Sequence, residues 1–168
     1  MNTVRTVSLQ PLNAEDFAPF GDVIEAGSGL QTQINAARFE RFSRLAAIDV
    51  DDNLDNLNVS VMRCATPSTL PLEFTLLERH PNGSQAFFPQ TNLPYVAVVA
   101  PPAATPDPTQ LKAFRCSPEQ GINLHRGVWH LPLLGFAPGQ SFFVVDNGAD
   151  DNCDEVTMDV TVTLEGTL

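Results

Sequence analysis

Hydrophobic and polar residues alternate along several short stretches of the chain, and this alternation predicts β-strands. The clearest stretch is VTMDVTVTL at residues 156–164, where apolar side chains occupy every second position and threonine or aspartate lies between them. A period of two with many β-branched residues is typical of a half-buried strand. Further strands are expected at residues 57–64, 72–80, 93–100 and 142–146. Glycine and proline turns separate these stretches, so the pattern predicts an all-β sandwich or barrel.

Helical signals are few and short. Residues 13–21 read NAEDFAPFG, with Asn13 as a candidate N-cap, acidic residues in the first turn and Gly21 as a stop. A second helix is expected around residues 38–45. The fold class is therefore all-β with minor helix.

Composition and charge limit the classes of partner that the protein is expected to bind. Hydrophobic residues make up 43% of the 168 residues and charged residues 17%, which fits one folded domain spanning residues 1–168. A formal net charge of −11 disfavours nucleic acid and anionic membrane surfaces. The chain has no apolar run of the roughly 18 residues needed to span a membrane, and its start lacks the apolar core of a signal peptide. We therefore expect a cytoplasmic protein. The net charge does not bear on a small ligand, because a few arginines in a pocket can hold a carboxylate.

Candidate chemistry gathers first at the end of the strand expected at residues 72–80. In a straight strand Glu78 and His80 share a face with Phe74 and Leu76. If these apolar residues face a barrel interior, a carboxylate and an imidazole continue the row inward, and Gln85 follows on the return strand. Buried charged groups must be paired or functional, so this row predicts a site. A surface pair formed by Glu78 and its arginine neighbour is the alternative.

A second group of polar residues lies in EQGINLHRGVWHLPL, at residues 119–133. His125 and His130 are five positions apart, so a straight strand would place them on opposite faces. A bulge at Gly127 would bring both to one side. Histidines that merely line a barrel rim are the alternative.

These two segments resemble known motifs. Glu78–x–His80–x4–Gln85 resembles the first cupin motif, with Glu in place of the first His and Gln in place of the final Glu, and residues 125–130 resemble the second motif. Longer strings are similar to the ureidoglycolate lyase family, in order and over nearly the whole chain: FAPFGDVIE, INAARFERF, LERHPNGSQAFFP, EQGINLHRGVWHLPL and DDNCDEV. One departure is Ala36–Ala37, where the family usually has Asn-Gly. The role of the acidic segment 150–155 stays open.

The resemblance implies a fold and an activity. It implies a cupin-type double-stranded β-barrel, jelly-roll-like, that forms a homodimer. It also implies cleavage of (S)-ureidoglycolate to glyoxylate and urea, a step of allantoin and purine breakdown. Two alternatives stay open: a metal-dependent cupin acting on another small hydroxy or keto acid, and a cupin that binds a ligand without turnover.

That reaction needs a base for the hydroxyl proton, an acid for the departing nitrogen and a cation for the carboxylate. We expect Glu78 and His80 to form the acid–base core, with His130 facing them and His125 as a further catalytic candidate. Arginine matches a carboxylate with two donors. Surface salt bridges are the alternative for each arginine. The substrate-binding candidates are Arg63, which shares parity with Val59 and Val61 and so is expected to end an inward row, together with Arg126, Gln85 and Asn123.

The cupin resemblance also suggests that the protein binds a metal ion. The corresponding ligand positions are Glu78, His80, Gln85 and His130, a set able to hold Mn, Ni or Zn weakly, since an amide is a poor ligand. The sequence leaves two alternatives open. Either such an ion is bound, or the protein has no cofactor and Glu78 acts as a base.

Overall fold

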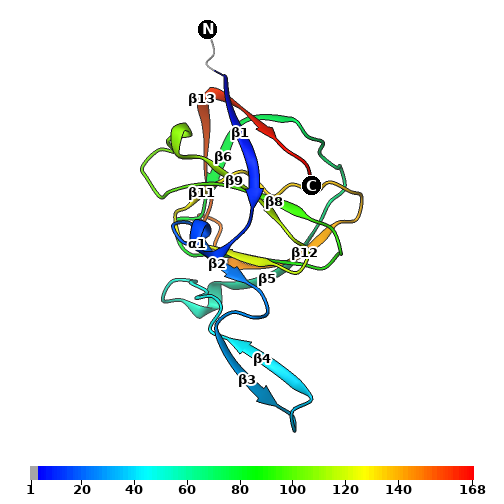
Figure 1. Ribbon diagram of the computed structural model, residues 1–168. Coiled ribbons are helices and arrows are strands. Elements are labelled where there is room, and N and C mark those ends of the chain that lie inside the picture. The colour runs from blue at the N-terminus through cyan, green and yellow to red at the C-terminus, as the bar shows by residue number, and fades with distance from the viewer. Residues whose placement is uncertain (1–3) are drawn as a thin grey trace.

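Two β-sheets pack face to face and carry a projecting hairpin in the computed structural model, which describes residues 4–168 (Figure 1). The first sheet closes on itself as a barrel, in the order β1 (Val4–Pro11), β13 (Asp154–Glu165), β6 (Leu72–Arg79), β11 (Trp129–His130), β8 (Tyr95–Ala100) and β9 (Lys112–Cys116). The second sheet has five strands, in the order β2 (Gly21–Ile24), β10 (Gly121–Leu124), β7 (Gln85–Pro89), β12 (Ser141–Asn147) and β5 (Leu57–Arg63). The hairpin consists of β3 (Leu30–Ile34) and β4 (Phe39–Ser43).

Helices are short. They are α1 (Ala14–Phe17) and the 3₁₀ turns η1 (Leu54–Asn56) and η2 (Pro108–Gln110). The Asn13 side chain accepts a hydrogen bond from the Asp16 N–H and caps α1, as the sequence predicts. Within residues 4–168, no helix has the length and apolarity required to cross a bilayer.

The closed sheet separates two apolar cores. One core lies between the two sheets, where Phe87 and Phe142 from the second sheet meet Tyr95 and Phe114 from the first. The other fills the closed barrel around Trp129, whose indole N–H donates to the Ala103 carbonyl. Burying one such side chain stabilises the fold by about 1.5–3 kcal/mol. The sheet between these cores is therefore rigid, and it carries the site described below.

The predicted all-β class is confirmed, and the expected strands match β5, β6, β8, β12 and β13 to within a few residues. The helix expected around residues 38–45 is wrong. That segment forms β4, which pairs antiparallel with β3. Its residues are mostly exposed, so no core selects a helical periodicity there.

Two expectations about side-chain direction are also wrong. Val59, Val61 and Arg63 share a face, but it is the exposed outer face of β5, the edge strand of its sheet. In a straight strand Leu77 would point away from the face that Phe74 shares with Glu78, yet it is fully buried in the same core as Phe74, three positions away. The register of β13 shifts opposite this part of β6, so the strand is not straight and simple alternation fails.

Candidate active site

A carboxylate and two imidazoles meet at the end of β6. Glu78 and His130 are register partners on β6 and β11, and Glu78 Oε1 lies 3.2 Å from His130 Nε2. The ring centroids of His80 and His130 are 5.2 Å apart. The His130 side chain is 4% exposed and that of Glu78 18%. We call these three residues the Glu78–His80–His130 cluster.

Backbone carbonyls fix both imidazoles. Nδ1 of His80 lies 2.6 Å from the Asn152 carbonyl, and Nδ1 of His130 lies 3.1 Å from the Val128 carbonyl. A carbonyl only accepts, so each Nδ1 carries the proton and donates it. Nε2 is the free atom of each ring, buried and without an aligned hydrogen-bond partner. Both Nε2 atoms are therefore available for a proton or an ion.

The Asn152 side chain holds the carbonyl that orients His80. Its Oδ1 accepts from the Asn82 N–H at 2.8 Å, and its Nδ2 donates to the Asn147 carbonyl at 2.8 Å. The residue is 3% exposed. The segment at residues 150–155 thus contributes to the site through the neutral residue Asn152. No sequence pattern points to this role, because a backbone carbonyl leaves no signature.

Opposing effects act on the pKa of Glu78. Burial raises this pKa, while the hydrogen bond and charge of His130 and the charge of His80 lower it, and the net result is a pKa below the ordinary value. Glu78 is therefore a carboxylate at neutral pH, able to accept a proton or bind a cation. The Cys153 thiol lies 3.9 Å from Oε2 of Glu78. Burial and the neighbouring carboxylates raise the thiol pKa, so Cys153 stays neutral.

Gln85 reaches the inter-sheet core from the second sheet. It is 8% exposed and donates from Nε2 to Asp146 Oδ2 at 3.2 Å. Asp146 also accepts from Asn58 Nδ2 at 2.9 Å. Sequence analysis missed Asp146 and Asn58, since they meet only through the pairing of β5 with β12.

His125, Asn123 and Arg126 lie in a different cluster, on the outer side of β10. Asn123 Nδ2 donates to Asp22 Oδ2 at 2.9 Å, and His125 Nε2 lies 3.1 Å from Asp22 Oδ1. Arg126 donates two hydrogen bonds to the Asp49 carboxylate, from Nε to Oδ2 at 2.8 Å and from one terminal guanidinium nitrogen to Oδ1 at 2.7 Å. Gly127 has a φ of 75°, and the chain turns there without bringing His125 to His130. These side chains fasten the segment around Asp49 to the sheet.

Arg63 lies apart from both clusters. It is exposed at the end of β5 and borders a hollow of about 160 Å³ together with Cys64, Ser68 and Gln140. This hollow is larger than the small cavity beneath His130. It holds none of the paired acid–base groups, so the Glu78–His80–His130 cluster is the stronger candidate for chemistry.

The cluster fits a divalent transition metal ion. One ligand atom from each of Glu78, His80 and His130 lies within 4.8 Å of the others. Imidazole nitrogens with a carboxylate oxygen suit Zn, Ni or Mn. Histidines that bind metals typically donate the other ring N–H to a carbonyl or carboxylate, as both rings do here.

The fold and this cluster define a cupin-type β-barrel with a small polar site on its closed sheet. The family model described as ureidoglycolate lyase matches residues 4–165. The chain is 48% identical to the ureidoglycolate lyase of Burkholderia mallei over 147 residues, which cover 88% of this chain and 85% of that protein. It is 43% identical to that of Pseudomonas syringae pv. tomato, with 90% and 89% covered, and 42% identical to that of Pseudomonas aeruginosa, with 90% of each covered. The chain belongs to the ureidoglycolate lyase family.

Proposed function

We propose that this protein cleaves (S)-ureidoglycolate to glyoxylate and urea, as a lyase of allantoin and purine breakdown. Family membership over residues 4–165 supports the reaction. The observation that carries the assignment to a site is the Glu78–His80–His130 cluster, with two free Nε2 atoms beside one carboxylate. The proposed catalytic unit is the whole chain, residues 1–168.

The reaction is a retro-addition that consumes no water and no oxidant. The hydroxyl loses its proton, and the O–H electron pair forms the carbonyl of glyoxylate. The C–N bond breaks with its electrons on the urea nitrogen, which takes up a proton. One proton is removed and one returned, so a base and an acid on opposite sides of one carbon suffice, each contributing about 10²–10⁴-fold.

The cluster offers both groups. Glu78, a carboxylate at neutral pH, accepts the hydroxyl proton. His80, whose Nδ1–H is fixed on the Asn152 carbonyl, serves as the acid when a second proton is bound at Nε2, and that proton passes to the leaving nitrogen. His130 Nε2 lies 3.2 Å from Glu78 Oε1, on the neighbouring strand. His125 stands outside this unit, beside Asp22.

The substrate carboxylate needs a positive partner. Arg126 is engaged by Asp49, and Arg63 lies on the outer face of β5, so each would need to move or act from outside. A divalent ion held by Glu78, His80 and His130 would add a positive charge there and polarise an oxygen of the substrate. In that case Glu78 and both Nε2 atoms are ligands, and none of the three is left to transfer protons.

Product analysis tests the reaction and the role of metal together. Chelator-treated protein is incubated with racemic ureidoglycolate, with and without Mn²⁺, Ni²⁺ or Zn²⁺, and urea, glyoxylate and ammonia are measured. Urea and glyoxylate without added ion support Glu78 as a base, whereas turnover only with an ion supports a metal site. Ammonia in place of urea contradicts the lyase, and no turnover under any condition favours a ligand-binding protein.

Glu78→Gln isolates the carboxylate within the same experiment. It is expected to lower kcat by about 10²–10⁴-fold with the fold retained. Glu73→Gln is the matched control, because Glu73 is an exposed residue on the same strand. Near-normal turnover by Glu78→Gln would remove Glu78 from the catalytic role.

We also propose a homodimer in the cytoplasm. The outer face of β5 and β12 exposes Leu57, Val59, Val61 and Phe143, with Val61 and Phe143 directly opposite in the ladder. An apolar edge strand of this kind is usually covered. Sedimentation of the native protein and of Val59→Glu tests this: a dimer that becomes a monomer supports the proposal, and a native monomer contradicts it.

A further inference from the structure

Three polar side chains form a row across the second sheet, on the neighbouring strands β5, β12 and β7. Asp146 is the register partner of both Asn58 and Gln85. Each neighbour donates to a different oxygen of its carboxylate, Asn58 at 2.9 Å and Gln85 at 3.2 Å. The row is therefore a carboxylate held between two amide donors.

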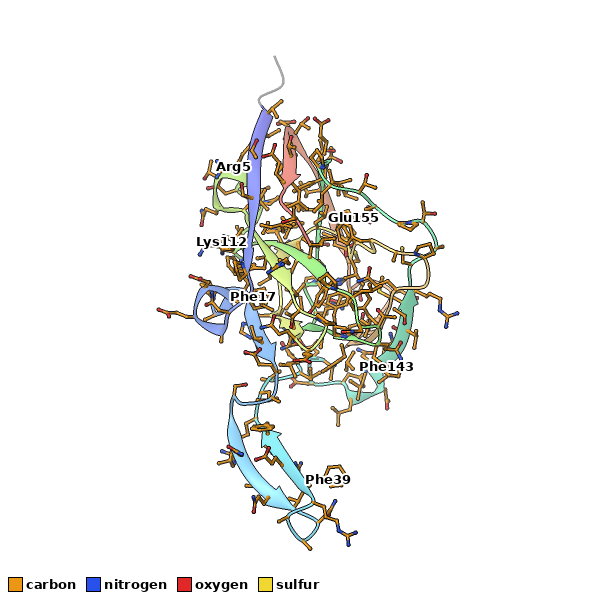
Figure 2. All side chains as sticks on the ribbon, turned by 45° about the vertical axis from the view of Figure 1, so that its right-hand side comes forward. Arg5, Phe17, Phe39, Lys112, Phe143 and Glu155 are labelled. Atoms are coloured by element: carbon orange, nitrogen blue, oxygen red, sulfur yellow. The ribbon has the colours of Figure 1, made fainter. Side chains whose placement is uncertain are left out.

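This row faces the space between the sheets. Phe142 and Val144 precede Asp146 at steps of two and are buried in the inter-sheet core. Gln85 pairs directly with Leu124, and Leu124 lines a small cavity together with His130 of the opposite sheet. Asp146 and Gln85 thus lie on the inter-sheet face of the second sheet, and Gln85 is the ladder neighbour of Leu124, which borders this cavity together with His130. Figure 2 shows the side chains between the two sheets.

The row offers more acceptors than the protein itself uses. A carboxylate accepts at about four lone-pair positions, and donors of Asn58 and Gln85 occupy two on Asp146. Because Gln85 directs its Nε2 to Asp146, its Oε1 points elsewhere, and that oxygen is buried without a hydrogen-bond donor. A buried unpaired acceptor is costly unless a ligand supplies a donor.

We propose that Asp146 and Gln85 bind the terminal amino group of the ureido part of the substrate. The inference rests on the proposed lyase function and deepens it. That amino group carries two N–H donors and no acceptor of use to a carboxylate, so it complements the free positions of Asp146 and Oε1 of Gln85. This pair selects a ureido group over an amide, while the Glu78–His80–His130 cluster acts at the carbon.

The test compares ureidoglycolate with 2-acetamido-2-hydroxyacetate, in which a methyl group replaces the terminal amino group. A site that hydrogen-bonds a substrate group rejects the analogue lacking it by a large factor. We expect the native protein to prefer ureidoglycolate by at least about 100-fold in kcat/KM. Asp146→Asn, which presents donors to the amino group, is expected to reduce this preference to within about tenfold, mainly by lowering kcat/KM for ureidoglycolate.

Controls separate recognition from folding. Asp154→Asn, which removes a carboxylate bound to Arg79 at the surface, is expected to keep the native preference. Gln85→Met removes Oε1 at similar volume and leaves Asp146 in place, so it tests the inference even if Asp146→Asn does not fold. Its expected preference lies between those of the native protein and Asp146→Asn.

Each outcome of this comparison either supports or overturns the proposed ureido subsite. Equal losses for both compounds in Asp146→Asn and Gln85→Met, or an unchanged preference in both, would overturn the inference while leaving the lyase intact. A native protein that cleaves neither compound overturns the proposed function and this inference with it. Loss of preference in both variants supports the ureido subsite.

Discussion

A substitution at Ala37, at the tip of the β3–β4 hairpin, is expected to change the free energy of hairpin opening by an amount that can be measured. Asn35, Ala36 and Ala37 have φ values of 55°, 56° and 62°, between the paired residues Ile34 and Phe39. Two consecutive residues with positive φ are typical of the hairpin turns that favour Asn-Gly. This chain instead places Ala36 and Ala37 at these positions.

The size of the effect follows from two opposing terms. The left-handed conformation costs a residue with a Cβ about 1–2 kcal/mol, and Ala37→Gly removes that cost. Glycine also loses more conformational freedom on folding, which costs about 0.5–1 kcal/mol. The net expectation is that Ala37→Gly stabilises the closed hairpin by about 0.5–1 kcal/mol, a two- to fivefold change in its opening equilibrium.

Amide hydrogen exchange reads this equilibrium directly. The hairpin pairs only with itself and projects from the body, so it can open without global unfolding (Figures 1 and 2, the second labelling Phe39 on it). Slower exchange of the paired amides of β3 and β4 in Ala37→Gly is expected, by about two- to fivefold. Ala104→Gly is the control: Ala104 is exposed and not among the residues with positive φ, so glycine there gives no stabilisation. Equal or faster hairpin exchange in Ala37→Gly would refute the strained-turn argument.

Three further predictions concern the packing around the site. The hydrogen bond from Arg126 holds the pKa of Asp49 below its ordinary value of 3.8 despite partial burial, so this carboxylate contributes stability above that pH and loses it as the pH falls through the folded pKa. Urea titrations should show Asp49→Asn less stable than the native protein at pH 7, by at most about 1 kcal/mol, with a difference that shrinks as the pH falls below 3.8. Gly83→Ala places a Cβ 2.5 Å from the Asp49 carbonyl, and thermal unfolding should show a loss of about 1–3 kcal/mol. Asn152→Ala removes two buried hydrogen bonds beside His80, so both stability and kcat should fall, whereas a change in stability alone would remove the positioning role.

Strand prediction succeeded where burial on one side imposes a period of two. The stretch around residues 156–164 became β13, with Met158, Val162 and Leu164 buried. The hairpin was missed because β3 is exposed on both faces, so no alternation marks it. Parity showed which residues share a face but not which face is inside, and this is why Val59 and Arg63 were placed wrongly.

From the sequence, the candidate site could be predicted only where its residues are close together along the chain. Glu78 and His80 lie on one short segment, and the strand pairing of β6 with β11 adds His130. Asp146 could not be found in this way, because its role depends on amide donors from two other strands. His125 and Arg126 looked equally suitable in the sequence, yet nearby carboxylates bind them on the outer side of the sheet.

The geometry imposes a choice on Glu78 that decides how the site works. With Nδ1 of both imidazoles bound to carbonyls, protons and ions can reach the rings only through Nε2, next to this single carboxylate. An ion that binds Glu78 removes the lone pair that would accept a proton, so the carboxylate cannot serve both purposes at once. If activity survives removal of metal, the Glu78 carboxylate is free to act as the base. If it requires metal, Glu78 and both imidazoles are ligands, and Asn152, which fixes the His80 ring, becomes as important to metal binding as the ligands themselves.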